Sequence, residues 1–318
     1  MKNMNENLYI SSLKNKNVTF RQVSEYDAMR VMHYRFPYNK LEEFFPLFET
    51  YNKGERSGQF INLDFSQLYH LAEIELFLCQ LILDICLEIE ISLKARLISE
   101  ATLCGDSEEF FQAYISSDQE YINKAFSPGN YDIANSNGRT IDLAQMSFSE
   151  FVMNAQFGTL ERVIHAFYKK HAPDIYSSPA APFEGHLGSI RRLRNITAHN
   201  NPLLGRLLLQ QEHLDLKLLA LLGKEGISHR TLKTNMGRAI ISDVCGLLYE
   251  YTNLCCNTTS LKDKMIKFSL EYCEPNCSLY EKADVLASSY RFMKKAVPII
   301  LKSNSRYSKL GVDDTGLL

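Results

Sequence analysis

Residues 59–104 contain neither glycine nor proline, and apolar side chains recur along this stretch at helical intervals. Because glycine and proline are the residues that most often end a helix, their absence over so long a stretch favours a single long helix. Within it, residues 87–94 alternate between apolar and polar side chains, a pattern that alone is typical of a half-buried strand. We predict a helix there as well, because no turn-forming residue lies nearby.

The same helical periodicity continues along most of the chain and predicts an all-α fold. The predicted helices lie at residues 24–34, 38–52, 66–103, 107–125, 147–171, 187–201, 203–223, 228–258, 260–272 and 279–303. Pro46 and Pro298 lie inside two of these helices, and each proline is expected to kink or end its helix. Turn-forming residues predict loops at residues 127–138 and 172–188.

The charge balance limits how this chain can bind nucleic acid. With 318 residues, 45% of them hydrophobic, the chain can bury a large core, but its formal net charge of −2 excludes a surface coated in basic residues. Any nucleic-acid site must therefore be local. The longest apolar region, residues 68–103, is interrupted by too many charges for a membrane span. Residues 1–17 lack the apolar core of a secretory signal, so we expect a cytoplasmic protein with no membrane partner.

The eight cysteines are expected to remain free thiols in a reducing compartment. The nearest approach to a metal site is the set Cys255, Cys256, Cys273 and Cys277. Its spacing is atypical of zinc sites and no histidine lies close by in the sequence. We therefore expect no metal and no cofactor.

One hexapeptide has a residue pattern with recognisable chemistry. Residues 194–199 read Arg-Asn-Ile-Thr-Ala-His, directly before an Asn-Asn-Pro sequence that is expected to close a short helix. An imidazole can move the proton of the ribose 2′-OH or of the leaving oxygen, while a guanidinium stabilises charge on the phosphate. Arginine and histidine can therefore cleave RNA without a metal. An Arg and a His at such a spacing are expected about once by chance, as Arg206 and His213 illustrate, but Asn directly after Arg lowers that expectation to roughly a few in a hundred.

On a helix, the side chains of this motif are expected to lie on different faces. Asn195 and His199 are four residues apart and share a face, which Arg192 joins. Arg194 lies about 140° from His199 around the helix axis, so it must bend back or act on a site shared with a second chain. The alternative is an ordinary amphipathic helix whose Arg and His side chains are only solvated. Its inward-facing residues would be Ile190, Leu193 and Thr197.

The carboxyl end is a second candidate for RNA binding. No Asp or Glu occurs between residues 285 and 312, where Tyr290, Phe292 and Tyr307 alternate with basic residues. These basic residues are Arg291, Lys294, Lys295, Lys302, Arg306 and Lys309. Such a stretch can follow a phosphate backbone while its aromatic rings stack on bases. The alternative is a solvated last helix with aromatic residues facing the core. Arg191 and Arg192, just before the motif, are further candidates for RNA contact.

Several segments resemble the Abi-like proteins of bacterial abortive infection. Residues 193–199 are similar to that family's Arg-Asn-x2-Ala-His block, which is the specific part of the resemblance. Three shorter segments, 34–36, 157–160 and 68–96, resemble its Tyr-Arg block, its Phe-Gly block and its long central helix. The resemblance covers residues 20–260.

The resemblance implies a HEPN-like helical bundle with helical additions. The HEPN-like domain would span residues 21–260, between a polar segment at 1–20 and a helical extension with a basic end at 261–318. Arg194, Asn195 and His199 would be the active-site residues of a metal-independent endoribonuclease in phage defence, with two motifs facing each other across a homodimer. In that hypothesis His199 is the general acid/base, Arg194 stabilises the phosphate, and Asn195 orients the imidazole. The products would carry a 2′,3′-cyclic phosphate and a 5′-hydroxyl.

Two other functions remain open at this point. The chain could be a catalytically silent module that holds a small structured RNA, since some relatives are thought to associate with such an RNA. It could also be a toxin component regulated by a partner protein.

Overall fold

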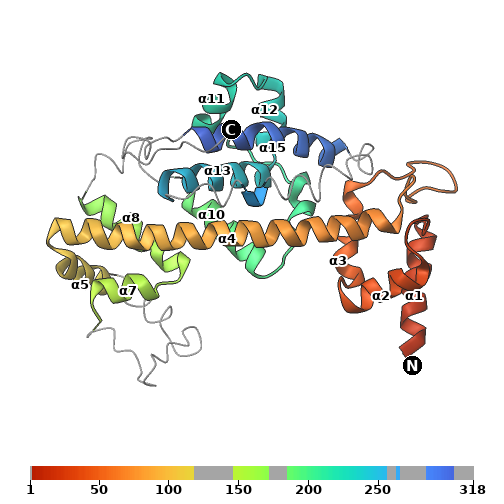
Figure 1. The fold of residues 1–318 in the computed structure, drawn as a ribbon, viewed down its shortest axis with the longest axis horizontal. Coiled ribbons are helices and arrows are strands. Elements are labelled where there is room, and N and C mark those ends of the chain that lie inside the picture. Colours follow the sequence, from red (N-terminus) through yellow and green to blue (C-terminus); the bar gives the residue numbers. More distant parts are fainter. Residues whose placement is uncertain (1, 118–145, 172–184, 256–262, 266–283, 304–318) are drawn as a thin grey trace. The chain divides into compact units, whose positions relative to one another are not determined.

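The computed structural model describes residues 2–117, 146–171, 185–255, 263–265 and 284–303 (Figure 1). Within these ranges the chain is helical, and the only β-type pairing consists of isolated bridges such as that between Thr19 and Asp64. The predicted all-α fold class is confirmed. The predicted loop at 127–138, most of the loop at 172–188, and Arg306 lie outside the described residues.

The elements form two compact units, one of residues 1–85 and 193–318 and the other of residues 86–192. The α-helices are α1 (Lys2–Asn15), α2 (Glu25–Tyr34), α3 (Tyr38–Glu42), α4 (Phe65–Cys104), α5 (Ser107–Ser117), α7 (Phe148–Asn154), α8 (Phe157–His171), α10 (Leu187–Ala198), α11 (Leu216–Lys224), α12 (His229–Met236), α13 (Ala239–Leu254) and α15 (Asp284–Lys302). Two 3-10 helices are η1 (Phe45–Leu47) and η3 (Leu204–Leu208). The predicted division at residues 20 and 260 remains a prediction, because residue 260 lies outside the described ranges.

Helix α4 is the long helix that the absence of glycine and proline predicts (Figure 1). Residues 87–94 lie inside it, so the alternation in that segment does not produce a strand. Gly105 follows its last residue with φ +76°, a left-handed conformation that glycine adopts without steric cost and that commonly ends helices.

The first turn of α4 is stabilised by the carboxylate of Asp64. One of its oxygens accepts bonds from the backbone N–H and the hydroxyl of Ser66, at 3.0 and 2.7 Å. The other oxygen accepts bonds from the hydroxyl of Thr19 and the backbone N–H of Arg21, both at 2.8 Å. Burial acts to raise the pKa of Asp64, but these four hydrogen bonds outweigh it and the pKa is lowered.

The unit of residues 1–85 and 193–318 is built largely around α13 and α15, which lie side by side (Figure 1). Helices α11 and α12 contact both each other and α15, and η3 contacts α13. The side chains of α13 and α15 that bury most completely are Cys245, Leu247, Leu248, Tyr251, Phe292, Ala296 and Ile300. Apolar burial of this kind is the main favourable term in the folding of such a unit.

The unit of residues 86–192 has a core of aromatic rings. Phe110 of α5 lies edge-on to Phe148 of α7 and to Phe167 of α8, with ring centroids 5.8 and 5.5 Å apart. Ser147 and Glu150 form a capping box that begins α7. Edge-to-face ring pairs are favourable beyond their burial, so these contacts hold the three helices together.

Three predicted helices are broken in the structure. Residues 147–171 divide into α7 and α8, residues 203–223 into η3 and α11, and residues 228–258 into α12 and α13. The last two breaks have a common cause, because the chain segments at the two breaks are hydrogen-bonded to each other. The N–H of Ala239 donates to the carbonyl of Leu209, and the N–H of Gln211 donates to the carbonyl of Gly237. Long-range bonds thus replace the helical bonds at both breaks.

The prediction for residues 1–20 missed a helix. The segment is polar, as predicted, but most of it forms α1, which buries Ile10 and Leu13. Pro46 acts as expected, since α3 ends before it and only a 3-10 turn contains it. Pro298 does not end its helix, because α15 continues through it to Lys302.

The remaining predictions concern thiols, metals and the membrane. Cys79, Cys86, Cys104, Cys245 and Cys255 are free thiols, whereas Cys256, Cys273 and Cys277 lie outside the described residues. Within the described ranges, no cluster of three or more His, Cys, Asp or Glu side chains could hold a metal ion. In the same part of the chain, each helix is too short or too polar to cross a bilayer.

Candidate active site

Residues 194–198 of the Arg-Asn-x3-His motif form the end of α10, which is shorter than the predicted helix at 187–201. His199 directly follows the helix, and Asn200 then adopts a left-handed conformation with φ +49°. The N–H of Asn200 donates to the carbonyl of Thr197 at 3.1 Å, and the N–H of Asn201 donates to the carbonyl of Ile196 at 2.9 Å. This pair of bonds is the Schellman motif, which closes a helix at a left-handed residue. The Asn-Asn-Pro sequence therefore ends the helix at a defined point.

One side of α10 is buried, and this burial fixes how the motif is presented. Its apolar residues Ile190 and Leu193 are fully buried, and Ile196 is nearly so. Thr197 is also buried, and its hydroxyl donates to the carbonyl of Leu193 at 2.9 Å. The burial of Ile190, Leu193 and Thr197 is what an amphipathic helix requires, and it is also what a helix presenting a catalytic face requires.

Asn195 and His199 are exposed, one helical turn apart. The backbone N–H of His199 donates to the carbonyl of Asn195 at 3.2 Å, so the two residues are joined by the last bond of the helix. Within the described residues, neither side chain makes a hydrogen bond or an ion pair. Both polar groups are therefore available to a ligand from solvent.

Arg194 is placed differently from His199. Its side chain is half-buried, and its Nε is buried without a hydrogen-bond acceptor among the described residues. An unsatisfied buried donor is costly, and such groups in native structures call for an explanation. Among the described residues, no hydrogen bond joins the guanidinium of Arg194 to the imidazole of His199.

Arg191 and Arg192 occupy the preceding turn of α10 and are exposed. Arg191 forms an ion pair with Glu161 at 3.3 Å, and Arg192 donates to the hydroxyl of Ser189 at 2.8 Å. Because Arg191 already has an anionic partner, an RNA phosphate would have to compete with that carboxylate.

A buried ion pair lies next to the end of the motif, and the sequence did not predict it. Glu75 of α4 is fully buried, and Lys40 of α3 is 8% exposed. Their charged groups are 2.5 Å apart. Desolvation acts to lower the pKa of Lys40, but the interactions with Glu75 and Glu43 outweigh it and the pKa is raised. Lys40 therefore remains charged at neutral pH.

The sequence does contain a signal for this pair. Glu75 belongs to a row of buried α4 residues spaced four and three apart. The row includes Leu68, Ala72, Glu75, Cys79 and Ile82. A carboxylate in such a row must be partnered once the helix packs. The signal indicates a buried partner without identifying it.

The basic residues of α15 are exposed, as both the RNA-binding interpretation and the solvated-helix alternative require. Arg291, Lys294, Lys295 and Lys302 are all exposed, whereas Phe292 is buried in the core. Arg291, Lys295 and Lys302 follow one another at helical intervals of four and seven, so they form one row. Phe292 is therefore a core residue and not a base-stacking residue. Tyr290 is half-buried, and Tyr307 lies outside the described residues.

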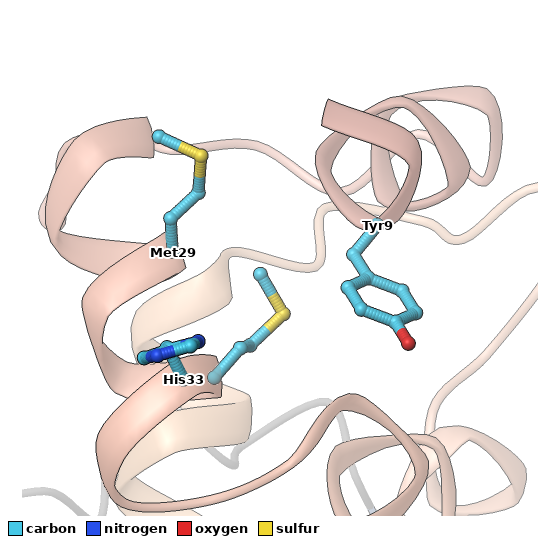
Figure 2. Close-up of a pocket in the computed structure, with 4 residues that line it drawn as sticks. Tyr9, Met29 and His33 are labelled. Carbon is cyan, nitrogen blue, oxygen red and sulfur yellow. The ribbon is translucent and has the colours of Figure 1, made fainter. Parts of the chain in front are cut away.

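A small pocket between α1 and α2 contains no residue of the motif. It is lined by Tyr9, Met29, Met32 and His33, three of which are labelled in Figure 2. The lining is mostly apolar, and the ring of Tyr9 stacks on Tyr38 at 4.7 Å. The pocket offers no arrangement of acid, base and nucleophile.

Comparison with known proteins gave one match. The family model described as Abi-like protein matches residues 21–204, a range that contains the whole Arg-Asn-x3-His motif. No curated protein and no solved structure matched the chain.

Proposed function

The chain belongs to the Abi-like protein family, and from that premise we propose that it is a HEPN-type, metal-independent endoribonuclease of phage defence. Membership in this family indicates a function of the abortive-infection type. The observation that carries the finer proposal is the exposed pair Asn195 and His199 at the closed end of α10. Neither side chain has a partner among the described residues, so both are free to engage RNA.

The chemistry assigns one role to each motif residue. The imidazole of His199 accepts the proton of a ribose 2′-OH, the resulting oxygen attacks the adjacent phosphorus, and the bond to the 5′-oxygen breaks. A protonated imidazole supplies the proton that the leaving 5′-oxygen takes. The products are a 2′,3′-cyclic phosphate and a 5′-hydroxyl. Arg194 stabilises the charge on the phosphate, and Asn195 orients the imidazole.

A second chain explains the position of Arg194. Because helical spacing places Arg194 and His199 on different faces and Arg194 Nε lacks an acceptor among the described residues, we propose that two motifs pair across a two-fold axis. Arg194 of one chain then lies beside His199 of the other. The partners of this protein are thus RNA and a second copy of itself.

The test is cleavage of RNA by the purified chain, followed by identification of the new ends. We expect a 2′,3′-cyclic phosphate and a 5′-hydroxyl, unchanged rates with a chelator present, and no cleavage by His199→Ala. Inhibition by the chelator would point to a metal mechanism and contradict this one.

The half-buried Arg194, whose Nε has no acceptor among the described residues, also favours a second candidate, a silent module that holds a small structured RNA. In that case the wild type cuts no RNA, one abundant RNA copurifies with it, and His199→Ala binds that RNA equally well. Sequencing the copurified RNA separates the two functions.

A further inference from the structure

The chain immediately after the motif is held by a single buried carboxylate. Oε2 of Glu75 accepts hydrogen bonds from the backbone N–H groups of Leu203 and Leu204, at 2.9 and 2.6 Å. Its other oxygen faces the ammonium of Lys40 at 2.5 Å. Both oxygens of a fully buried carboxylate therefore have partners, as a buried charge requires.

Lys40 extends this arrangement to the residue after His199. Its Nζ lies 3.4 Å from the carbonyl oxygen of Asn200 and 3.0 Å from the carboxylate of Glu43. Lys40 and Glu75 thus contact the chain on both sides of Asn201 and Pro202. We call these two side chains, together with the backbone groups they bind, the clamp.

The clamp acts where the helix itself gives little support. His199 lies beyond the last residue of α10, where helix ends fray and backbone groups lack helical partners. Its position depends on the two Schellman bonds and on where the following chain is fixed. Displacing a catalytic group by about 1 Å can lower a rate by about 100-fold.

We propose that Lys40 and Glu75 are positioning residues for His199, an inference that rests on the proposed function. They do not touch the substrate. They fix residues 200–204, and through them they hold the imidazole at the angle that the reaction requires. The clamp is far from the motif in sequence, since Lys40 and Asn200 are separated by 160 residues.

The test removes both charges together, because removing Lys40 alone would leave the carboxylate of Glu75 fully buried without a cation, whereas Lys40 can still pair with Glu43. The variant is Lys40→Met with Glu75→Gln, which keeps similar side-chain volumes and leaves an amide oxygen to accept one backbone bond. The matched control is Lys14→Met with Glu25→Gln, an ion pair of similar length, 2.7 Å, whose side chains are about half exposed. A third protein, Lys40→Arg, keeps the ion pair.

Two readouts are measured on each protein, the steady-state cleavage of RNA and the amide hydrogen exchange of residues 199–208. In the double variant we expect kcat to fall about 10- to 100-fold with KM little changed. We also expect faster exchange at residues 199–208 and unchanged exchange in α13. The control pair should retain wild-type values, and Lys40→Arg, which keeps a cation beside Glu75, should lie closer to the wild type than the double variant does.

The outcomes separate the clamp from the proposed nuclease. Faster exchange with an unchanged kcat would mean that the pair is only structural, and it would overturn the positioning role. Unchanged exchange would overturn the clamp itself. If the wild type cuts no RNA, the proposed nuclease fails, while the exchange measurement still decides whether the clamp holds the motif. Should the double variant unfold, Glu75→Gln alone is judged by the same two readouts.

Discussion

Arg194 and His199 lie five residues apart at the end of one helix, yet the first is half-buried and the second is exposed. On an ideal helix their side chains would leave the axis about 140° apart, and here His199 lies one residue beyond the end of α10. A reaction that uses both groups therefore requires either a large reorientation of Arg194 or a second chain. A site within one chain and a site shared by two chains predict different results for the variants of Arg194 and His199.

Replacement of His199 by alanine is expected to abolish RNA cleavage without changing the fold. The side chain is exposed and makes no contact among the described residues that stabilises the chain, so the thermal midpoint should stay within about 1 °C. The matched control is His213→Ala. His213 is also exposed and lies in a loop, and together with Arg206 it matches the Arg–His spacing without the following Asn. Cleavage lost equally in both variants would contradict a specific role for His199.

Mixing two inactive variants should restore activity if the site is shared between chains. In a mixture of Arg194→Ala and His199→Ala, about half of the dimers are mixed, and each mixed dimer has one intact site. The expected rate is about a quarter of the wild-type rate. A site contained within one chain would give no recovery at all. Mass measurement showing only fully active monomer at micromolar concentration would also exclude the shared site.

The basic row on α15 should contribute to RNA affinity through counterion release. Replacing Arg291, Lys295 and Lys302 with Gln should weaken binding of different RNA sequences equally, because phosphate contacts carry no sequence information. For single-stranded RNA the slope of log K against log salt should fall by about 2. The control replaces three exposed cations of the amino-terminal region, Arg21, Lys53 and Arg56, and should leave the slope unchanged. Extending the substitutions to Lys294 and Arg306 tests two further basic residues that the sequence predicts to bind RNA.

Acid should destabilise the chain partly through Asp64. Its pKa is lowered in the folded state, so the carboxylate contributes stability that is fully present above the unfolded pKa of about 3.9. That stability is lost as the pH falls through the folded pKa. The free energy of unfolding, measured with urea, should therefore fall less in Asp64→Asn than in the wild type when the pH is lowered from 5 to below the folded pKa of Asp64. Glu109→Gln, at an exposed position of α5, should follow the wild-type curve.

Local sequence rules were sufficient for part of this fold. The absence of glycine and proline predicted α4, and the Asn-Asn-Pro sequence predicted where α10 closes. Both results follow from interactions between neighbours in sequence. They succeed because each helix also has a buried side consistent with its local preference.

Features that depend on distant partners were missed. The breaks near Leu209 and Gly237 are stabilised by bonds between the two segments, and periodicity within either segment continues across its break. The ion pair of Lys40 and Glu75 joins residues on different helices, so spacing could only indicate that Glu75 needs a partner. The sequence predicts the three motif residues as a site, but their unequal exposure depends on the packing of α10.

The hydrogen bond between Leu203 and Glu75 joins residues 128 positions apart. During synthesis the ribosome makes Lys40 and Glu75 long before it makes Leu203. A nascent chain that already contains His199 therefore still lacks the backbone groups that Glu75 binds, and any chain truncated before residue 203 lacks them permanently. If the motif does cleave RNA, incomplete products of translation are the form of this protein least able to harm the cell that makes them.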